Sequence, residues 1–211
     1  MSSLIFIRHG ETAMAGRFCG HSDPELNPAG ETQATRAAEE VAKLGVQRIY
    51  SSDLLRASQT ATVVGLRIGV KVEVRRDLRE ICFGLWEGLN WPEIEDRYPA
   101  EAKRWLDEFP SHTAPCGEAY EEFTKRVDAA ISALLQEAAT QTTAVVTHRG
   151  VMRYALTKSF GFTEADAWSR TAPYGAVVIV AIGSRNGTED QSISTRELPE
   201  TVKTIAGNKE R

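Results

Sequence analysis

Short apolar segments alternate with amphipathic helical segments along most of this chain. The apolar or alternating runs lie at residues 4–7, 46–52, 70–78, 142–148 and 176–183. Between them, apolar side chains recur at helical spacing, most clearly over residues 118–138. Alternation of strands and helices is typical of a parallel sheet with helices on both faces. We therefore expect an α/β fold, a three-layer αβα sandwich with a mostly parallel central sheet.

Two helix starts can be predicted from capping residues. Asn27 followed by Pro28 predicts the start of the first helix, because proline is favoured in the first helical turn. Ser52 or Asp53 is the expected N-cap of the second helix. A later helix is expected from about Val151 to Phe160.

The 211 residues are expected to form one main domain, over residues 1–183. The segment from about 82 to 117 has no strand signal, so we expect an insertion over one edge of the sheet, helical from about 92 to 108 with a break at Pro99. Residues 184–211 are polar without clear periodicity and are expected to form a partly disordered C-terminal tail.

Composition excludes several classes of protein. Hydrophobic residues make up 42% of the chain and charged residues 26%, as in ordinary soluble proteins. A formal net charge of −4 argues against nucleic-acid and acidic-membrane partners. No apolar stretch approaches the roughly 20 residues of a membrane helix. The three cysteines are widely spaced and odd in number, which favours a reducing, cytoplasmic location. A homodimer is one assembly that such a chain could form.

Ionisable residues follow the ends of the expected strands. Arg8 and His9 follow the first strand, Arg56 stands early in the second helix, Glu80 follows the third strand and His148 the fourth. Ligands of open α/β sheets bind at this edge. Arginine forks bind phosphate oxygens, and a neutral histidine can attack phosphorus. A second histidine can stabilise transition-state charge, and a carboxylic acid can protonate the leaving group. These residues predict a phosphoryl-transfer site.

Glycines follow both histidines of this set. Gly10 comes after the first, and we expect it to let the backbone approach a ligand without a Cβ in the way. Arg149 and Gly150 come after the second histidine. Metal binding by the two histidines is disfavoured, because no nearby carboxylate or cysteine completes a ligand set and the arginines would oppose a cation.

Four segments carry a resemblance to a known family. In order, "RHGET", "SSDLLRASQT", "LREICFGLWEG" and "VVTHRG" resemble the motifs of the histidine phosphatase superfamily, which includes cofactor-dependent phosphoglycerate mutases. The resemblance implies a phosphoglycerate mutase-like fold. It also implies that His9 is the phosphorylated nucleophile, that Arg8, Arg56 and His148 form the phosphate pocket, and that Glu80 is the proton donor. The family needs no metal.

Two further segments narrow the resemblance. "FCGHSDPELNPAGETQA" and "FGLWEG" are most similar to the small phosphatases, especially α-ribazole phosphatases. Gly20, in the first of these segments, and Arg149 are the additional candidate substrate contacts. Arg149 departs from the family, which often has glycine or alanine there. A second departure is that residues 13–15 read Ala-Met-Ala where the family often has Trp-Asn.

Mutase features are missing at two places. Mutases carry an arginine after the donor glutamate and an Arg-Arg pair downstream, whereas Ile81 follows Glu80 and no such pair precedes the last long helix. We therefore expect a phosphatase that hydrolyses a small phosphorylated metabolite through a phosphohistidine, without a cofactor. A cofactor-dependent phosphoglycerate mutase and a catalytically silent phosphoester-binding protein are the alternatives.

Several candidate residues have ordinary structural interpretations as well. Arg149 could pair with an acid such as Glu87 or point to solvent. His21 and His112 are expected to be ordinary surface residues. Arg17 and Arg153 are weaker candidates for substrate contacts. The tryptophans of the insertion, Trp86, Trp91 and Trp105, are expected to pack within it rather than to line a substrate wall.

Overall fold

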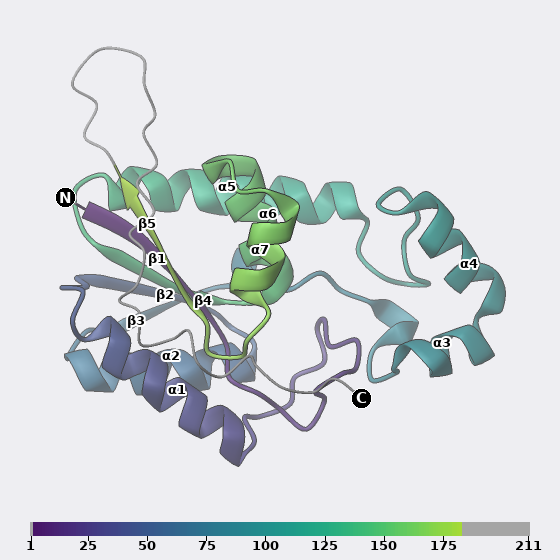
Figure 1. Cartoon of the computed structure of the whole chain (residues 1–211), viewed down its shortest axis with the longest axis horizontal. Helices are drawn as coiled ribbons and strands as arrows, with labels where there is room; N and C mark the ends of the chain where they lie inside the picture. Colours follow the sequence, from purple (N-terminus) through teal and green to yellow (C-terminus); the bar gives the residue numbers. More distant parts are fainter. Residues whose placement is uncertain (1, 183–211) are drawn as a thin grey trace, which may run out of the picture.

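Five strands form the central sheet of the computed structural model, which describes residues 2–182 (Figure 1). They are β1 (Ser2–Arg8), β2 (Arg48–Ser52), β3 (Val72–Arg75), β4 (Thr143–Thr147) and β5 (Val177–Ile182). The spatial order is β3-β2-β4-β1-β5, and every neighbouring pair is parallel except β1 with β5. The predicted mostly parallel sheet is confirmed, and β1, β2 and β4 end at the same side.

Helices cover both faces of this sheet. They are α1 (Pro28–Val41), α2 (Leu55–Ile68), α3 (Trp91–Arg97), α4 (Pro99–Glu108), α5 (Tyr120–Ala138), α6 (Arg149–Phe160) and α7 (Glu164–Thr171). In Figure 1, α1 and α2 lie on one side of the strands, and α5 and α6 lie on the other. The predicted three-layer αβα arrangement is therefore confirmed.

Strand β1 shows how the sequence builds these layers. Leu4 and Phe6 point into the hydrophobic cluster under α5 and α6, whereas Ile5 and Ile7 point into the cluster under α1 and α2. All four side chains are fully buried. Because successive strand side chains face opposite sides, a continuous apolar run is what a strand between two helical layers requires. Each buried side chain contributes about 1.5–3 kcal/mol.

The predicted cap of α1 is confirmed and that of α2 is wrong. Asn27 caps α1, and its side chain accepts a hydrogen bond from the Gly30 amide at 2.8 Å. Helix α2 begins after Leu54, which makes no side-chain cap. The carboxylate of Asp23, which is distant in sequence, accepts the Leu55 amide instead.

The two residues expected to cap α2 are used elsewhere. Asp53 forms two hydrogen bonds of 2.6 Å with the guanidinium of Arg79. Ser52 Oγ is hydrogen-bonded to His148. Local sequence cannot show these partners, because Arg79 follows β3 and His148 follows β4, both far from residues 52–53 in the chain.

Residues 82–117 form a small lobe with α3 and α4, and the helices are separated at Pro99 as predicted. This lobe differs from the expected position, because it extends beyond the carboxyl ends of the strands rather than over an edge (Figure 1). Phe18, in the loop after β1, anchors it there, with ring centroids 4.9 Å from Phe83 and 5.9 Å from Trp86. Trp86 is fully buried, and Trp91 and Trp105 pack around it, as expected.

Helix α7 follows α6 and was not predicted. Thr163 caps it by accepting the Asp166 amide at 3.1 Å. The expected tail at 184–211 lies outside the described residues. The three cysteines, all in the described segment, are free thiols. Within residues 2–182, no helix has the length and apolar character needed to cross a bilayer.

Candidate active site

His9 lies at the carboxyl end of β1, and its main chain is fixed from two sides. Its amide donates to the Thr147 carbonyl of β4 at 3.0 Å, and its carbonyl accepts the Gly175 amide at 3.2 Å. The ring Nδ1 lies 2.7 Å from the Gly10 carbonyl. Because a carbonyl only accepts, Nδ1 carries the proton and Nε2 keeps its lone pair. This tautomer leaves Nε2 available as a nucleophile.

The surroundings of His9 also keep its ring neutral. Burial is the main reason that the pKa of His9 lies well below its ordinary value of 6.5, and the charges of Arg56 and Arg8 lower this pKa further. A neutral imidazole holds the free electron pair that an attack on phosphorus requires. The site therefore prepares both the protonation state and the tautomer of this residue.

Arg56 lies on the first turn of α2 and is fully buried beside His9. Its Nε lies 3.3 Å from His9 Nε2. Its Nη atoms donate to the carbonyls of Cys19 at 3.0 Å, Gly20 at 2.8 Å and Ser22 at 2.7 Å. The guanidinium therefore connects His9 to the loop after β1.

Gly20 does not have the position expected of a substrate contact. It is buried, and its carbonyl is an acceptor for Arg56. The cavity described below is lined by the neighbouring Cys19 and not by Gly20. Among the described residues, Gly20 thus supports the arginine rather than the cavity surface.

Arg8, the last residue of β1, is held by the end of α7. Its Nη1 donates to the Thr171 carbonyl at 3.2 Å and to the Ala172 carbonyl. Its Cζ lies 3.9 Å from the centre of the Tyr174 ring. Sequence reasoning missed Tyr174, which also lies 5.8 Å from the His9 ring, although an aromatic residue in a turn before a strand was a usable signal.

His148 follows β4 and lies against His9. The ring centroids of His9 and His148 are 5.1 Å apart, and His148 is fully buried. Its Nε2 is 2.9 Å from Ser52 Oγ, and its Nδ1 has no hydrogen-bond partner in the described part of the chain. Burial and the charge of Arg56 lower the pKa of His148 well below 6.5.

Glu80 comes from the segment after β3 and is seated at the start of α6. Its Oε2 accepts the Gly150 amide at 2.9 Å, and its Oε1 accepts the Ile81 amide at 3.0 Å. A Cβ atom at Gly150 would lie only 2.2 Å from Glu80 Oε1. The glycine after His148 and Arg149 therefore makes room for the carboxylate.

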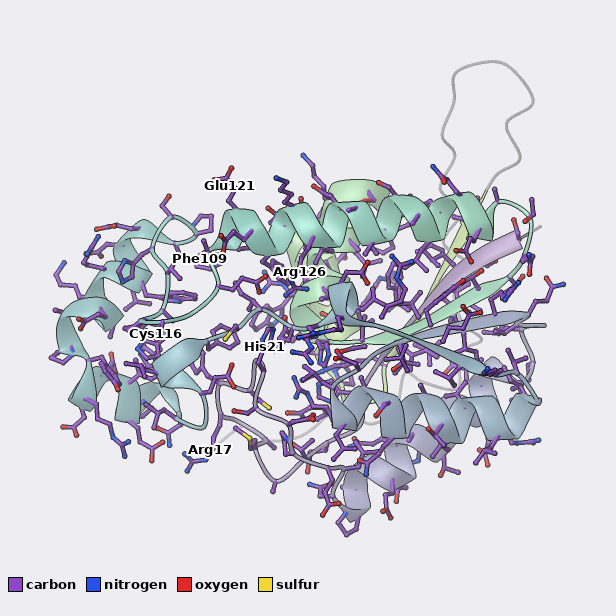
Figure 2. The ribbon with its side chains drawn as sticks, turned by 180° about the vertical axis from the view of Figure 1, so that it is seen from behind. Arg17, His21, Phe109, Cys116, Glu121 and Arg126 are labelled. Carbon is purple, nitrogen blue, oxygen red and sulfur yellow. The ribbon has the colours of Figure 1, made fainter. Side chains whose placement is uncertain are left out.

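Two side chains from other elements hold the backbone of Glu80. Arg126 of α5 donates to the carbonyls of residues 77, 79 and 80, at 3.1, 2.6 and 2.8 Å (Figure 2). Its charge is neutralised by Glu118, at 2.6 and 2.8 Å. His21 Nε2 lies 3.1 Å from the Glu80 carbonyl. His21 is thus part of the site support, and the expectation of an ordinary surface residue was wrong.

Gly10 is required for a different reason from the one expected. A Cβ atom at Gly10 would lie 2.4 Å from the Gly30 carbonyl of α1. The glycine therefore allows helix α1 to approach the end of β1, and this contact, rather than a ligand, excludes a larger side chain.

Glu87 organises the loop between Cys19 and Ser22. Its carboxylate accepts the amides of His21 at 2.6 Å and Phe83 at 3.2 Å, and it accepts both the amide and the hydroxyl of Ser22. These hydrogen bonds hold the Glu87 carboxylate at this loop. Among the described residues, the suggested ion pair between Glu87 and Arg149 is not formed.

A cavity of about 650 Å³ opens in front of these residues. Arg8, His9 and Glu80 lie on its wall. Aromatic side chains extend this wall, namely Phe18, Phe83, Trp105, Phe109, Tyr120, Phe123, Tyr154, Trp168 and Tyr174. Trp105 packs in the small lobe as expected but also lines this cavity, so the expectation that it would not line a wall was wrong. Among the described residues, no three His, Cys, Asp or Glu side chains are grouped so that they could hold a metal ion.

The sequence model of the histidine phosphatase superfamily (branch 1) matches residues 4–192. This chain belongs to the histidine phosphatase superfamily. The matched region contains His9, Arg56, Glu80 and His148.

Relatives include phosphatases. Phosphoserine phosphatase 1 of Hydrogenobacter thermophilus is 30% identical over 171 residues, which are 80% of this chain and 81% of that protein. A bifunctional protein of Mycobacterium tuberculosis is 37% identical over 127 residues, 59% of this chain. That match spans 35% of the mycobacterial protein, so the chain covers about a third of its length.

The fold is shared with solved structures of small phosphatases. The crystal structure of the α-ribazole phosphatase from Shigella flexneri superposes with a TM-score of 0.77, over 86% of this chain and 91% of that one, at 24% identity. The similarity to this group that was expected from the sequence is confirmed at the level of the fold.

Proposed function

We propose that this protein hydrolyses small phosphomonoesters in two steps through a phosphohistidine on His9. In the first step, the His9 Nε2 lone pair attacks phosphorus and the P–O ester bond breaks. Glu80, as a carboxylic acid, gives its proton to the departing oxygen. In the second step, water attacks phosphorus and Glu80 takes its proton. The P–N bond breaks, and phosphate and neutral His9 are released.

The tautomer of His9 is the main observation that supports this proposal. Its Nδ1 proton is donated to the Gly10 carbonyl, so Nε2 keeps its lone pair, which accepts a hydrogen bond from Arg56 Nε, and His9 lines the same cavity as Glu80. Attack and protonation need two groups on opposite sides of the transferred phosphorus, and we assign these two roles to His9 and Glu80.

The cations of the site have distinct roles in this proposal. Arg8 faces the cavity and binds phosphate oxygens, and its stacking on Tyr174 fixes its direction. Arg56 Nε and the unpartnered Nδ1 of His148 supply hydrogen bonds that stabilise charge as the phosphoryl group moves. These groups are arranged before the substrate binds, so little reorganisation opposes the reaction.

Hydrolysis is proposed in preference to mutase activity because two arginine features of the mutases are missing from the sequence. The residue after Glu80 is Ile81, and the downstream segment lacks an Arg-Arg pair. Phosphoserine phosphatase 1, which is similar over 80% of this chain, supports the same choice. The proposed partner is a small phosphorylated metabolite, and no cofactor takes part.

Trapping the intermediate tests the proposal. The protein is mixed with a ³²P-labelled phosphomonoester and quenched within one turnover. We expect an acid-labile, base-stable label on the peptide that contains His9, and no label in His9→Ala. Turnover in His9→Ala should fall by several powers of ten while its circular dichroism spectrum is unchanged, since the ring lies at a strand end.

Two results would contradict this assignment. Activity of His9→Ala within tenfold of the parent, on a folded protein, would exclude a covalent role for His9. Binding of phosphomonoesters without label or release of phosphate would indicate a silent phosphoester-binding protein.

A further inference from the structure

Two arginines on α6 share one aromatic ring on the cavity wall. Arg149 Cζ lies 3.6 Å from the centre of the Trp168 ring, and Arg153 Cζ lies 4.7 Å from it. The arginines are one helical turn apart, and Trp168 comes from α7. All three residues line the same cavity as His9 and Glu80. The ring therefore fixes two positive charges beside the proposed reaction centre.

This arrangement places two positive charges together with only partial compensation by carboxylates. Side chains four residues apart on a helix are neighbours, and like charges there repel. Arg153 pairs with the Glu164 carboxylate at 3.0 Å, but that carboxylate is largely exposed, so solvent screens the pair. Within residues 2–182, Arg149 has no anionic partner, and its Nε is buried without a hydrogen bond. Burial and the charge of Arg153 lower the pKa of Arg149.

The arginines lie on the side of the cavity where the leaving group must be. Glu80 is the proposed proton donor to the leaving oxygen, and it is hydrogen-bonded to the Gly150 amide. Arg149 is the residue immediately before this amide. A substituent on the leaving group thus comes within reach of Arg149 once its oxygen faces Glu80.

We propose that Arg149 and Arg153, held by Trp168, bind a second anionic group carried by the leaving group of the substrate. A carboxylate or a second phosphate fits, since both accept the paired donors of a guanidinium. This inference rests on the proposed phosphatase function and narrows its substrates to phosphomonoesters with a further negative charge. Stacking on Trp168 holds the guanidinium groups before binding, which reduces the entropy lost on binding.

Matched aromatic phosphates test the inference. The ortho, meta and para isomers of carboxyphenyl phosphate are compared with the corresponding carbamoylphenyl phosphates, which have the same shape without the charge. A parallel series uses phenylene bisphosphates, which separates a preference for carboxylate from one for phosphate. We expect kcat/KM to favour at least one acidic compound over its neutral counterpart by about tenfold or more, as a charge-assisted hydrogen bond allows.

Substitutions of the two arginines then test whether these residues cause the preference for acidic compounds. Arg149→Gln is expected to reduce the acidic-to-neutral ratio to within about twofold of one, mainly through KM, since a contact made equally in the bound and transition states acts on binding. Arg153→Gln should reduce the ratio partially. In Arg149→Glu, the preference for acidic compounds should be replaced by a preference for the cationic aminomethylphenyl phosphates. The control is Arg170→Gln, because Arg170 also stacks on a ring, Phe162, but does not line the cavity.

The outcomes separate this inference from the function on which it rests. If every phosphate releases product and none of the acidic compounds is preferred, the anion subsite is wrong and the phosphatase stands. An unchanged preference in Arg149→Gln would likewise overturn the subsite. If no compound is hydrolysed and His9 acquires no label, the phosphatase proposal itself fails.

Discussion

Arg56 Nε lies 3.3 Å from Nε2 of His9, and the same guanidinium donates three hydrogen bonds to the loop after β1. One buried cation therefore contacts both the ring of His9 and the loop after β1. Since Arg56 is fully buried, we expect its charge and its fork geometry both to matter at this place.

We predict that Arg56→Lys is nearly as inactive as Arg56→Ala. Lysine keeps the charge but lacks the fork, so at least one of the three loop carbonyls loses its donor, at a cost of about 1–3 kcal/mol in the free energy of unfolding. The turnover number should fall by about a hundredfold or more. Kinetics and urea unfolding of both variants check this, and a lysine variant with more than a tenth of parental turnover would refute the fork requirement.

Glu80 and Gly150 should share one kinetic signature. Glu80→Gln removes the proposed proton donor, and Gly150→Ala should displace the same carboxylate because the added Cβ would meet Oε1 at 2.2 Å. Loss of general acid catalysis harms poor leaving groups most. We expect both variants to lose about a hundredfold on alkyl phosphates and less than tenfold on p-nitrophenyl phosphate. Equal losses on the two classes of substrate would remove Glu80 from the donor role.

Arg126 is expected to act through Glu80. It donates to three carbonyls of the segment that carries this residue. Arg126→Gln should therefore lose more activity on alkyl phosphates than on p-nitrophenyl phosphate, by about tenfold. The control is Arg104→Gln, whose exposed side chain pairs with Glu108 on the surface of α4. A uniform loss on both substrates would indicate a general structural role.

Strands and helices could be predicted from the sequence where the local pattern of apolar residues agrees with the packing in the fold. The continuous apolar run of β1 predicted a strand that is buried on both faces, and the apolar stripe of α5 predicted a helix that is buried on one face. Both predictions gave the correct type of element. The motif residues at the strand ends also came together as expected. Helix α7 was missed because it is short and has only two buried positions, Ala167 and Thr171.

Residues whose role depends on distant partners could not be predicted. Arg126 looks like an exposed helical residue until α5 is docked against the segment before Glu80. Tyr174 and Trp168 acquire their roles by stacking on arginines from other elements. The cap of α2 comes from Asp23, thirty-two residues before its partner Leu55. Such contacts are set by tertiary packing, which a local pattern does not encode.

Stability should fall in mild acid because of the two buried histidines. The pKa values of His9 and His148 lie well below 6.5 in the folded protein, mainly because of burial. In the unfolded chain, these groups bind protons as the pH falls through about 6.5. Below that pH the unfolded state therefore binds more protons, and the free energy of unfolding decreases. Between pH 7.5 and 5.5 the two residues together can account for at most about 2.7 kcal/mol.

Urea unfolding of the parent, His9→Asn and His148→Asn at both pH values measures this effect. Each variant should lose about half of the pH dependence. A parent whose stability changes no more than that of the variants over this range would show that the histidines titrate normally.

The last prediction concerns what attacks the phosphohistidine. A mutase must keep water away from this group and hold phosphoglycerate by its carboxylate until the phosphoryl group returns. The cavity of about 650 Å³ is many times the roughly 30 Å³ that one water molecule occupies, so a small acid such as phosphoglycerate leaves room for water beside it. In the proposed subsite, Arg149 and Arg153 hold an acidic leaving group, but they do not fill this space.

Glu80, once it has given its proton, can act as base toward a water molecule in the proposed second step. We therefore expect inorganic phosphate to be released faster than 2- and 3-phosphoglycerate interconvert, even with bisphosphoglycerate present. Coupled assays for both reactions on one preparation measure the ratio, and interconversion that outpaces phosphate release tenfold would assign the protein to the mutases.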